Sequence, residues 1–533
     1  MTSADRRLEV SIVVSSAIAP AWIEALVRRL AASPRFEVLL FLEPPAPRHA
    51  WPRAYRAYER VDARLFRRRR DALARVPLPG PPPRELTALD ECDVLLHFGS
   101  GDPAAVIGAT RYGVWILSHV DEQERRRVPP LFWEMYRRSL YRTTLEVHLP
   151  DGDRRVVYSS HGRPNRTSLH RSRNEAYWKS AGAIARALGA LCDRGQSYLE
   201  SRPHPEGLGE HDDEDGPPPT AAVVRHVGAV GVGVVARRLR KLAFREEWIV
   251  AARLVSGDSL VDDASVELDG FRPFPAAPGE HFADPFAVED GGETYVFFER
   301  YDEAARKAGI AYARLDSAAE PVGPPAPAIT RDYHVSYPFV FRQRGDIFMI
   351  PESLENETVD LYRAVDFPSG WVLEQRLLSG VCAVDATLLE ESSRLWLFVN
   401  VAEPGASLND ELHVYSSASL DGPWVPHPEN PVVSDVRRAR PAGRIVRRGG
   451  RAIRPSQDCS RGYGTAVVFN RIDVLTTDEY RETPIARVEP SWAPGLVGTH
   501  TYDSTGRLEV LDGRRFVLRS PLGRLATRAR RRG

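Results

Sequence analysis

The C-terminal half of the chain repeats one pattern, in which an apolar strand is followed by a polar turn and a second strand rich in aromatic residues. Equivalent positions in five copies are 54, 47, 58 and 57 residues apart, with Asp284, Pro338, Asp385, Gly443 and His500 as markers. Repeats of this length predict the blades of a five-bladed β-propeller. The first strand of each propeller blade lines the central channel, so residues at the starts of these strands should converge on one pocket.

Three acidic residues fall at these converging positions and form the candidate catalytic set: Asp284, Glu352 and Asp385. Glycosyl transfer or hydrolysis needs one ionised carboxylate as base or nucleophile and one protonated carboxyl group as acid. A third carboxylate can orient the sugar or keep the pKa of the acid high. We therefore expect Asp284 to be the base or nucleophile, Glu352 the acid and Asp385 the modulator. The alternative is that both aspartates only cap turns at strand starts.

Further polar and aromatic residues of the repeats are candidates for substrate binding. Aromatic rings offer faces on which a sugar can stack, and cationic side chains can bind its oxygen atoms. The predicted set is Tyr337, Trp396, Arg444, Gln457, Asp458 and His500.

The N-terminal part of the chain shows a different pattern. Apolar strands at 10–14 and 36–42 flank an amphipathic helix at 21–32, and two more buried strands follow at 93–97 and 113–117. Strands that alternate with helices in this way predict an α/β domain with a doubly wound parallel sheet.

The expected organisation is an α/β domain over 1–200, a linker over 201–222, a connecting helix over 223–244, a propeller over 245–518 and a basic tail over 519–533. The linker is rich in Pro, Gly and acidic residues and cannot bury enough apolar surface to order itself. The connecting helix is apolar and then basic, so it either packs against a domain or makes peripheral contact with a membrane. The Arg-rich tail is either a solvated end or a segment attracted to anionic lipid or polysaccharide.

Composition narrows the partners and the compartment. Seventy-two basic residues balance seventy-two acidic residues, so no net field favours nucleic acid, and no nucleic-acid partner is expected. The four cysteines lie far apart in the sequence, which favours a protein of the reducing cytoplasm, with membrane association as the alternative. No metal site is predicted, because no cysteine has a partner at the spacing of metal ligands. The longest apolar run, 221–235, contains Arg225 and His226 and is shorter than the roughly 20 residues that span a bilayer, so no transmembrane helix is expected.

The repeat motifs resemble known families. The Asp284-Pro-Phe opening and the segment Ile350-Pro-Glu-Ser353 are similar to the furanosidase-type propellers of arabinanases and xylosidases, which implies an Asp base, an Asp modulator and a Glu acid in the channel. The segments Arg454-Pro-Ser-Gln-Asp-Cys-Ser-Arg-Gly-Tyr-Gly464 and Gly498-Thr-His-Thr-Tyr502 resemble the N-terminal propeller module of plant glucosamine inositolphosphorylceramide transferases and of bacterial surface-glycan proteins. This resemblance covers about 245–518.

The N-terminal part resembles the formyltransferase fold of methionyl-tRNA and sugar formyltransferases, over roughly 8–195. The segments Tyr112-Gly-Val-Trp-Ile-Leu-Ser-His119 and Thr143-Thr-Leu-Glu-Val-His-Leu-Pro-Asp-Gly152 carry this resemblance. That family transfers a formyl group from 10-formyltetrahydrofolate with an Asn-x-His pair and a later Asp.

By position, His119 matches the family's His, and either Asp151 or Asp153 matches its Asp. Leu117 stands where the family has Asn, and leucine cannot donate a hydrogen bond to a developing oxyanion. Asp121 is the nearest acidic partner for His119 along the chain. The domain is therefore either a formyltransferase or a degenerate copy kept for binding or architecture.

Three functions follow from these patterns. The first is a carbohydrate-active protein of surface polysaccharide or glycoconjugate biosynthesis, with glycosyl transfer or hydrolysis in the propeller channel and a glycan or glycolipid as partner. The second is a formyl- or acyltransferase acting on an amino sugar, with the propeller recognising the glycan. The third is a non-catalytic glycan-binding scaffold. The candidate donors are 10-formyltetrahydrofolate and a nucleotide sugar.

Overall fold

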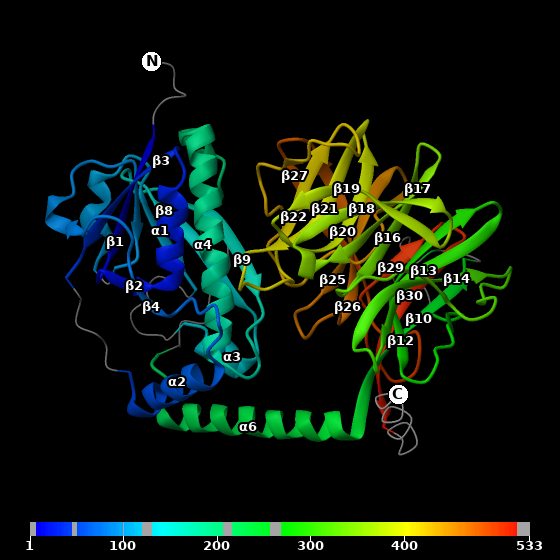
Figure 1. The fold of residues 1–533 in the computed structure, drawn as a ribbon. Coiled ribbons are helices and arrows are strands. Elements are labelled where there is room, and N and C mark those ends of the chain that lie inside the picture. The colour runs from blue at the N-terminus through cyan, green and yellow to red at the C-terminus, as the bar shows by residue number, and fades with distance from the viewer. Residues whose placement is uncertain are drawn as a thin grey trace. The chain divides into compact units, whose positions relative to one another are not determined.

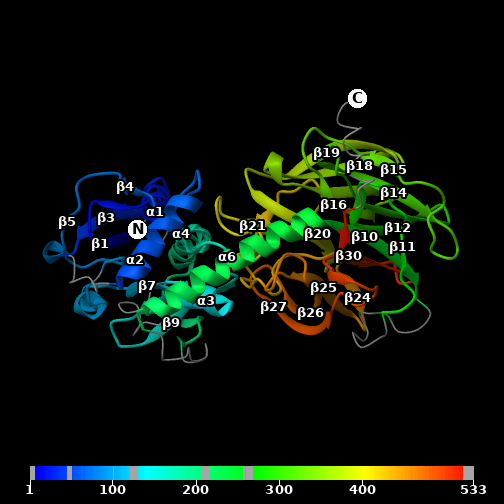
Figure 2. The ribbon, with the colours of Figure 1, turned by 90° about the horizontal axis from the view of Figure 1, so that it is seen from below.

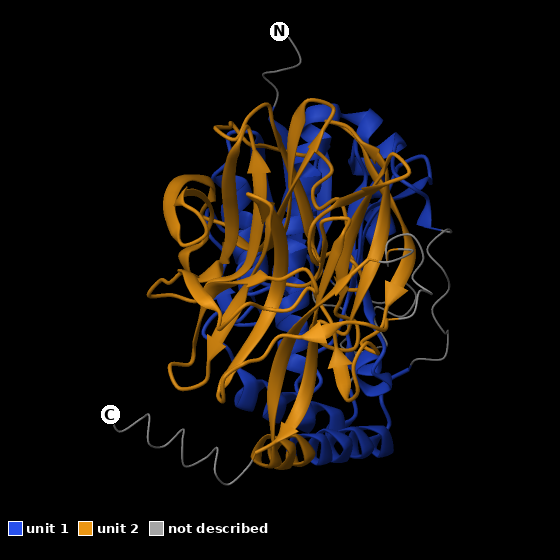
Figure 3. Ribbon diagram, turned by 90° about the vertical axis from the view of Figure 1, so that its right-hand side faces the viewer, with its two compact units in different colours: residues 1–234, 403–407 blue, residues 235–402, 408–533 orange. Residues whose placement is uncertain are grey.

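The computed structural model describes residues 7–44, 51–99, 101–119, 130–205, 216–255, 259 and 268–519, drawn in two orientations in Figure 1 and Figure 2. The chain divides into two compact units, which Figure 3 colours separately. The first comprises residues 1–234 and 403–407, and the second comprises residues 235–402 and 408–533. Asp121, the middle of the predicted linker and the tail from residue 520 lie outside the described residues.

The N-terminal unit contains a seven-stranded sheet with the order β5-β3-β1-β6-β7-β8-β9. The strands are β1 (Leu8–Val14), β3 (Phe36–Leu42), β5 (Arg84–Glu85), β6 (Val94–His97), β7 (Val114–Ser118), β8 (Tyr141–His148) and β9 (Arg154–Gly162). The first five strands of the sheet order, β5 to β7, run parallel to one another, as the alternation of strands and helices predicted. β8 and β9 are antiparallel, because a short turn joins them in place of a crossover helix. The sheet is therefore mixed, not wholly parallel as expected.

Helices of this unit pack on the sheet and on one another. They are α1 (Ala21–Ala31), α2 (Arg53–Phe66), α3 (Phe132–Arg137), α4 (Leu169–Arg194) and α5 (Gln196–Glu200), and a small ribbon pairs β2 (Ile18–Pro20) with β4 (Arg75–Pro77). α1 buries Trp22, Leu26 and Leu30, which recur at helical spacing and join the core under β1. Ser168 caps the N-terminus of α4, and its Oγ accepts a hydrogen bond from the Arg171 N–H (3.1 Å).

The described part of the C-terminal unit forms the five-bladed β-propeller that the repeats predicted (Figure 1). Each of the first four blades is a four-stranded antiparallel sheet of consecutive strands. Blade one holds β12 (Glu280–Asp290), β13 (Glu293–Asp302), β14 (Lys307–Leu315) and β15 (Ala326–Ile329), and blade two holds β16 (Ser336–Gln343), β17 (Asp346–Ser353), β18 (Thr358–Asp366) and β19 (Gly370–Ser379). Blade three holds β20 (Cys382–Glu391), β21 (Arg394–Ala402), β22 (Leu412–Ser417) and β23 (Val425–Pro426), and blade four holds β24 (Val446–Arg448), β25 (Arg451–Asp458), β26 (Ala466–Leu475) and β27 (Tyr480–Val488).

The fifth blade joins the two ends of the propeller. It holds β10 (Phe244–Leu254), β11 (Arg272–Pro273), β28 (Leu496–Gly498), β29 (Tyr502–Ser504) and β30 (Leu508–Leu518). β10 pairs with β30 in antiparallel fashion along its whole length, from Phe244 opposite Leu518 to Leu254 opposite Leu508. Because the first strand of the unit pairs with the last, blade five is built from both ends of the propeller, and backbone hydrogen bonds close the ring.

The predicted connecting helix is α6 (Thr220–Ala243), which runs from the first unit into the second (Figure 2). Among the described residues, α6 is the helix that is long and apolar enough to cross a membrane. The apolar run of the sequence ends at residue 235 and predicts no such helix, whereas the helix continues through Leu239 and Leu242.

Candidate active site

The same backbone irregularity recurs on the first strands of three blades. In β12, β16 and β20 the pairing with the next strand is interrupted at Asp284, Tyr337 and Asp385. These residues have positive φ angles of 54°, 45° and 55°. Such angles cost non-glycine residues about 1–3 kcal/mol, and bulges of this kind often redirect side chains beside functional sites. The repeat therefore places Asp284 and Asp385 at equivalent positions of two blades.

Asp385 is buried and accepts hydrogen bonds from two side chains. Arg440 lies in the segment that leads into blade four, and Gln457 lies on the second strand of that blade. Arg440 Nε lies 2.5 Å from Asp385 Oδ2, and Arg440 Nη2 lies 3.2 Å from Oδ1. Gln457 Nε2 also donates to Oδ2 (2.7 Å). A carboxylate that accepts several charge-assisted hydrogen bonds is stabilised in its ionised form. Gln457 is thus at the site, as predicted, whereas Arg440 was not predicted.

Glu352 lies next to Asp385 in a contrasting environment. Burial raises the pKa of Glu352 well above its usual range, the neighbouring Asp385 charge raises it further, and Arg440 opposes the shift. Arg440 Nη2 reaches only to 3.5 Å from Glu352 Oε2, a weak contact compared with its pair to Asp385. Glu352 therefore favours the protonated form, beside a carboxyl group that is paired with a cation.

Asp284 belongs to a second cluster, centred on His500. His500 Nε2 lies 3.3 Å from Asp284 Oδ1, and His500 Nδ1 lies 2.5 Å from Asp512 Oδ2. Thr501 Oγ1 also donates to Asp284 Oδ1 (2.8 Å). Burial raises the pKa of Asp284 to about 6, with His500 opposing the shift. Burial lowers the pKa of His500, but the carboxylates of Asp512 and Asp284 more than compensate, so that this pKa is raised overall.

Two half-buried aromatic rings connect these clusters. The Tyr463 ring lies 4.9 Å from the guanidinium carbon of Arg440 and 5.1 Å from the His500 ring. The Trp248 ring lies 4.1 Å from the His500 ring and 6.2 Å from the Tyr463 ring. Asp385, Glu352 and Asp284 thus belong to one site, bordered by rings on which a sugar could stack.

Glu299 is a further acidic residue of this site that the sequence analysis did not select. It lies on the second strand of blade one and is paired with Ala283, just before the bulge, as Glu352 on the second strand of blade two is paired with Ser336. Burial and the nearby Asp284 charge raise the pKa of Glu299 to about 8. The repeat itself carried the signal, because Glu299 stands at the position equivalent to Glu352.

The only group of described residues with a spacing that suits a metal ion is Asp284, His500 and Asp512, whose ligand atoms lie within 4.8 Å of one another. The imidazole stands between the two carboxylates. A protonated His500 compensates part of their charge, so the arrangement is also stable as an ion triad without a metal.

Four predicted substrate-binding residues lie elsewhere than the sequence suggested. Tyr337 is fully buried at its bulge, where its hydroxyl accepts a hydrogen bond from the Gly443 N–H (2.6 Å), so its ring face is covered. Trp396 is buried in the apolar cluster between blades three and four. Asp458 neighbours Gln457 on β25 but forms an ion pair with Arg487, since successive strand residues point to opposite faces.

Arg444 instead connects three blades. Its Nε donates to Asp503 Oδ1 (2.8 Å), and its Nη2 donates to the carbonyl oxygens of Ala287 (3.2 Å) and Val340 (2.7 Å). The Ala287 N–H in turn donates to Asp503 Oδ2 (2.7 Å). With its donors bound to backbone in blades one and two and to Asp503 of blade five, Arg444 holds the inner strands together.

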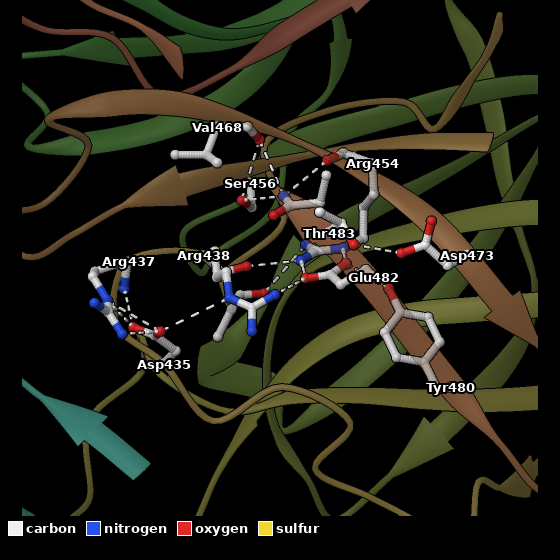
Figure 4. Close-up of polar contacts among 12 residues, drawn as sticks. Asp435, Arg437, Arg438, Arg454, Ser456, Val468, Asp473, Tyr480, Glu482 and Thr483 are labelled. Atoms are coloured by element: carbon white, nitrogen blue, oxygen red, sulfur yellow. Dashed lines mark hydrogen bonds and ion pairs between the residues drawn. The ribbon is translucent and has the colours of Figure 1, made fainter. Parts of the chain in front are cut away.

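A buried polar network fixes the segment that carries Arg440 (Figure 4). Arg454 is 1% exposed and forms a two-pronged pair with Glu482, Nε to Oε2 at 2.8 Å and Nη2 to Oε1 at 2.7 Å. Arg454 Nη2 also donates to the carbonyl oxygen of Arg438 (2.7 Å), two residues before Arg440. Tyr480 Oη donates to Glu482 Oε2 (2.6 Å). Arg454 opens the motif that the sequence analysis singled out, and its role is to anchor this segment.

The N-terminal candidates do not come together. His119 follows β7 and is buried, with its Nδ1 2.9 Å from Thr143 Oγ1 and its ring against Tyr177. Asp151 and Asp153 lie in the β8–β9 turn, beyond His148, which pairs with the opposite end of β7 from His119. Asp153 forms an ion pair with Arg155 (2.7 Å). The antiparallel direction of β8 therefore separates the two aspartates from His119 by the length of a strand.

Comparison with known proteins agrees with the resemblance seen in the propeller. Residues 273–492 match the family model described as glucosamine inositolphosphorylceramide transferase 1, N-terminal. The proteins named glucosamine inositolphosphorylceramide transferase 1 from Arabidopsis thaliana and from Oryza sativa subsp. japonica are each 36% identical over 214 residues. These matches cover 39% of this chain and 28% of each relative, so the chain spans less than a third of the relatives' length.

Solved structures give weaker similarities. A family 117 glycoside hydrolase of the marine bacterium Zobellia galactanivorans is 14% identical, with 51% of this chain and 91% of that chain covered and a TM-score of 0.32. The catalytic domain of an α-L-arabinofuranosidase of Coprinopsis cinerea is 15% identical, with 51% and 97% covered and a TM-score of 0.34.

Proposed function

We propose that the propeller is a carbohydrate-active enzyme that makes or breaks a glycosidic bond by acid–base chemistry. The observation that carries this proposal is the contrast between two adjacent buried carboxyl groups. Asp385 is paired with Arg440 and Gln457, whereas burial and the Asp385 charge raise the pKa of Glu352. A buried carboxyl group that keeps its proton, next to one that is held by a cation, supplies the acid and the charged partner that glycosyl chemistry needs.

Each residue then has a definite role. Glu352 gives its proton to the oxygen of the leaving group, and Asp385 keeps Glu352 protonated through its negative charge. Asp284, with a pKa of about 6, is largely ionised at neutral pH and acts as base or nucleophile. The doubly paired His500 orients Asp284, and Trp248 and Tyr463 supply faces for the sugar ring.

The substrate class is suggested by the names of the relatives. They are named as transferases that act with glucosamine and inositolphosphorylceramide, a sugar and a phosphate-linked lipid. The matched region is the propeller alone, so we infer that this module holds the glycan part of such a glycolipid.

The test is a screen of the full chain for product formation by mass spectrometry, with nucleotide sugars as donors and glycans or inositol phosphates as acceptors. Asp284→Asn and Glu352→Gln should each lower turnover by at least about 100-fold, because each removes a proton-transfer group. Glu390→Gln is the matched control, since this glutamate is exposed at the end of β20 and should keep full activity.

Binding measured by thermal shift on the same variants separates catalysis from recognition, because a ligand specific to the folded state raises the melting temperature. Sugar-dependent shifts that survive in both variants, together with lost turnover, support the enzyme. Sugar binding without product from the wild-type chain under any donor supports the scaffold instead. Unchanged turnover in both variants overturns the assignment of the site.

A further inference from the structure

The helix α6 exposes an apolar stripe along most of its length, which Arg238 interrupts near the C-terminal end. At 100° per residue, its members fall within an arc of about 140°. They are Val224, Val227, Gly228, Gly231, Val232, Val235, Leu239 and Leu242. Val232 is 71% exposed and Leu242 is 68% exposed. An apolar surface of this extent on one helix is unusual for a soluble protein and marks an interaction surface.

The other side of α6 is fixed to the rest of the chain near each end. Ala222, Val223 and His226 are buried, and the Tyr58 hydroxyl lies 3.1 Å from His226 Nε2. Near the C-terminal end, the Arg240 guanidinium stacks over the Phe516 ring at 4.5 Å. Within each unit, the residues that make these contacts lie on the side of the helix away from the apolar stripe.

The charges on α6 exclude a position across the bilayer. Between Arg225 and Arg237 lie eleven residues, which extend about 17 Å along a helix. The hydrocarbon core of a bilayer is about 30 Å thick. A helix with this pattern lies in the plane of the interface, with its apolar stripe in the acyl region and its cationic side chains at the headgroups.

Positive charge gathers at the C-terminal end of the helix. Arg237, Arg238 and Lys241 stand in its last two turns. Arg519 joins them, because its Nε donates to the carbonyl oxygens of Lys241 (3.1 Å) and Phe244 (3.2 Å). In the sequence, five more arginines follow within residues 524–532. No acidic residue occurs in α6, so this end is complementary to an anionic lipid surface.

We propose that α6 is a membrane-surface helix that docks the protein on an anionic bilayer through this stripe. The docking does not depend on the proposed sugar chemistry, because it uses none of the residues of the propeller site. It would bring the chain to the surface where lipid-linked glycans are found. The occupant of the stripe is thus a bilayer, not a protein partner.

The experiment is co-sedimentation of the full chain with vesicles of phosphatidylcholine alone and with vesicles that also contain phosphatidylglycerol. The wild-type chain should bind the anionic vesicles, and binding should weaken with added salt. Val232→Glu with Val235→Glu should reduce binding more than about ten-fold, because two charges enter the acyl region. Arg238→Gln with Lys241→Gln should reduce it about five-fold per charge.

Ala229→Glu is the matched control, since Ala229 is exposed on α6 but lies outside the stripe, and it should keep wild-type binding. Asp284→Asn should also bind normally, which separates this inference from the fate of the proposed function. Circular dichroism confirms that each variant is folded. The proposal is overturned if the wild-type chain does not bind anionic vesicles. It is also overturned if the variant with Val232→Glu and Val235→Glu binds them as strongly as the wild type. A dimer that dissociates in that variant, without vesicle binding, also overturns it and assigns the stripe to a second copy of the chain.

Discussion

Arg440 binds both carboxylate oxygens of Asp385, Nε to Oδ2 at 2.5 Å and Nη2 to Oδ1 at 3.2 Å, and both side chains are buried. A two-pronged pair of this kind fixes orientation as well as charge. Because the same guanidinium also faces Glu352, it limits how far the pKa of that group rises. The pair therefore controls both the stability of the channel and the protonation of the proposed acid.

Replacing Arg440 by Met should destabilise the protein by about 3–5 kcal/mol at neutral pH, because Asp385 would be left buried without its cation. The loss should shrink at acid pH, where protonation removes the uncompensated charge. Urea unfolding at pH 7.5 and pH 5 measures both values. Arg440→Lys retains the positive charge but cannot form the two-pronged hydrogen bond, so we expect an intermediate loss in the free energy of unfolding. Equal stability of Arg440→Met and wild type at pH 7.5 would show that the pair is not important.

The pattern of the sequence was sufficient for the blades and for the carboxyl groups at their inner strands, because repeats report directly on equivalent positions. It could not show the closure of the ring, since β10 lies before the first repeat and pairs with β30 at the far end of the chain. Arg440 was missed for a related reason. It lies in an irregular segment before β24, and only the folded chain brings it to Asp385.

Residue type alone was also insufficient to predict which side chains of the repeats reach the site. Arginine, aspartate and tryptophan in the repeats suit a sugar site, yet Arg444, Asp458 and Trp396 satisfy internal partners or fill the core. Which face of a strand a residue occupies depends on register, and a bulge changes that register by a residue. In the N-terminal unit, the direction of β8 decided that Asp151 would lie far from His119, and no short motif encodes that direction.

Glu299 should make the stability of the protein depend on pH. Its pKa is raised from 4.5 to about 8 by burial, so the folded state holds a proton that the unfolded state releases between these values. The free energy of unfolding therefore falls as pH rises from about 4.5 to 8, because the native state binds more protons. Glu299→Gln should flatten this slope in unfolding titrations between pH 5 and 8. The exposed Glu390→Gln should leave the slope as in wild type, and a slope unchanged in Glu299→Gln would contradict the assignment.

The Arg454–Glu482 pair should show strong coupling in a double-mutant cycle. Arg454→Met leaves Glu482 buried without its main partner and should lower the free energy of unfolding by about 3–5 kcal/mol. Glu482→Leu leaves Arg454 buried without its carboxylate partner and should cost a similar amount. The double variant should be more stable than either single variant, because it removes both charges. Chemical unfolding of the four proteins gives the coupling energy. Simple addition of the two single losses would show that the pair does not act as a unit.

Tyr337 and Gly443 should show how tightly the channel wall is specified. Tyr337→Phe removes the acceptor of the buried Gly443 N–H and the partner of Thr387 Oγ1, 3.0 Å away, and should cost about 1–3 kcal/mol without loss of the fold.

Gly443→Ala should be far more severe. Gly443 has a φ of 126°, and an added Cβ would lie 1.8 Å from the carbonyl oxygen of Tyr502, which belongs to the neighbouring blade. Because backbone cannot yield without separating blades four and five, we expect a loss above about 4 kcal/mol or no soluble protein. Thermal unfolding of both variants is the measurement, with Gly495→Ala, which has open space around it, as the control for a glycine of positive φ. A Gly443→Ala protein as stable as that control would show that the blades can shift apart at this point.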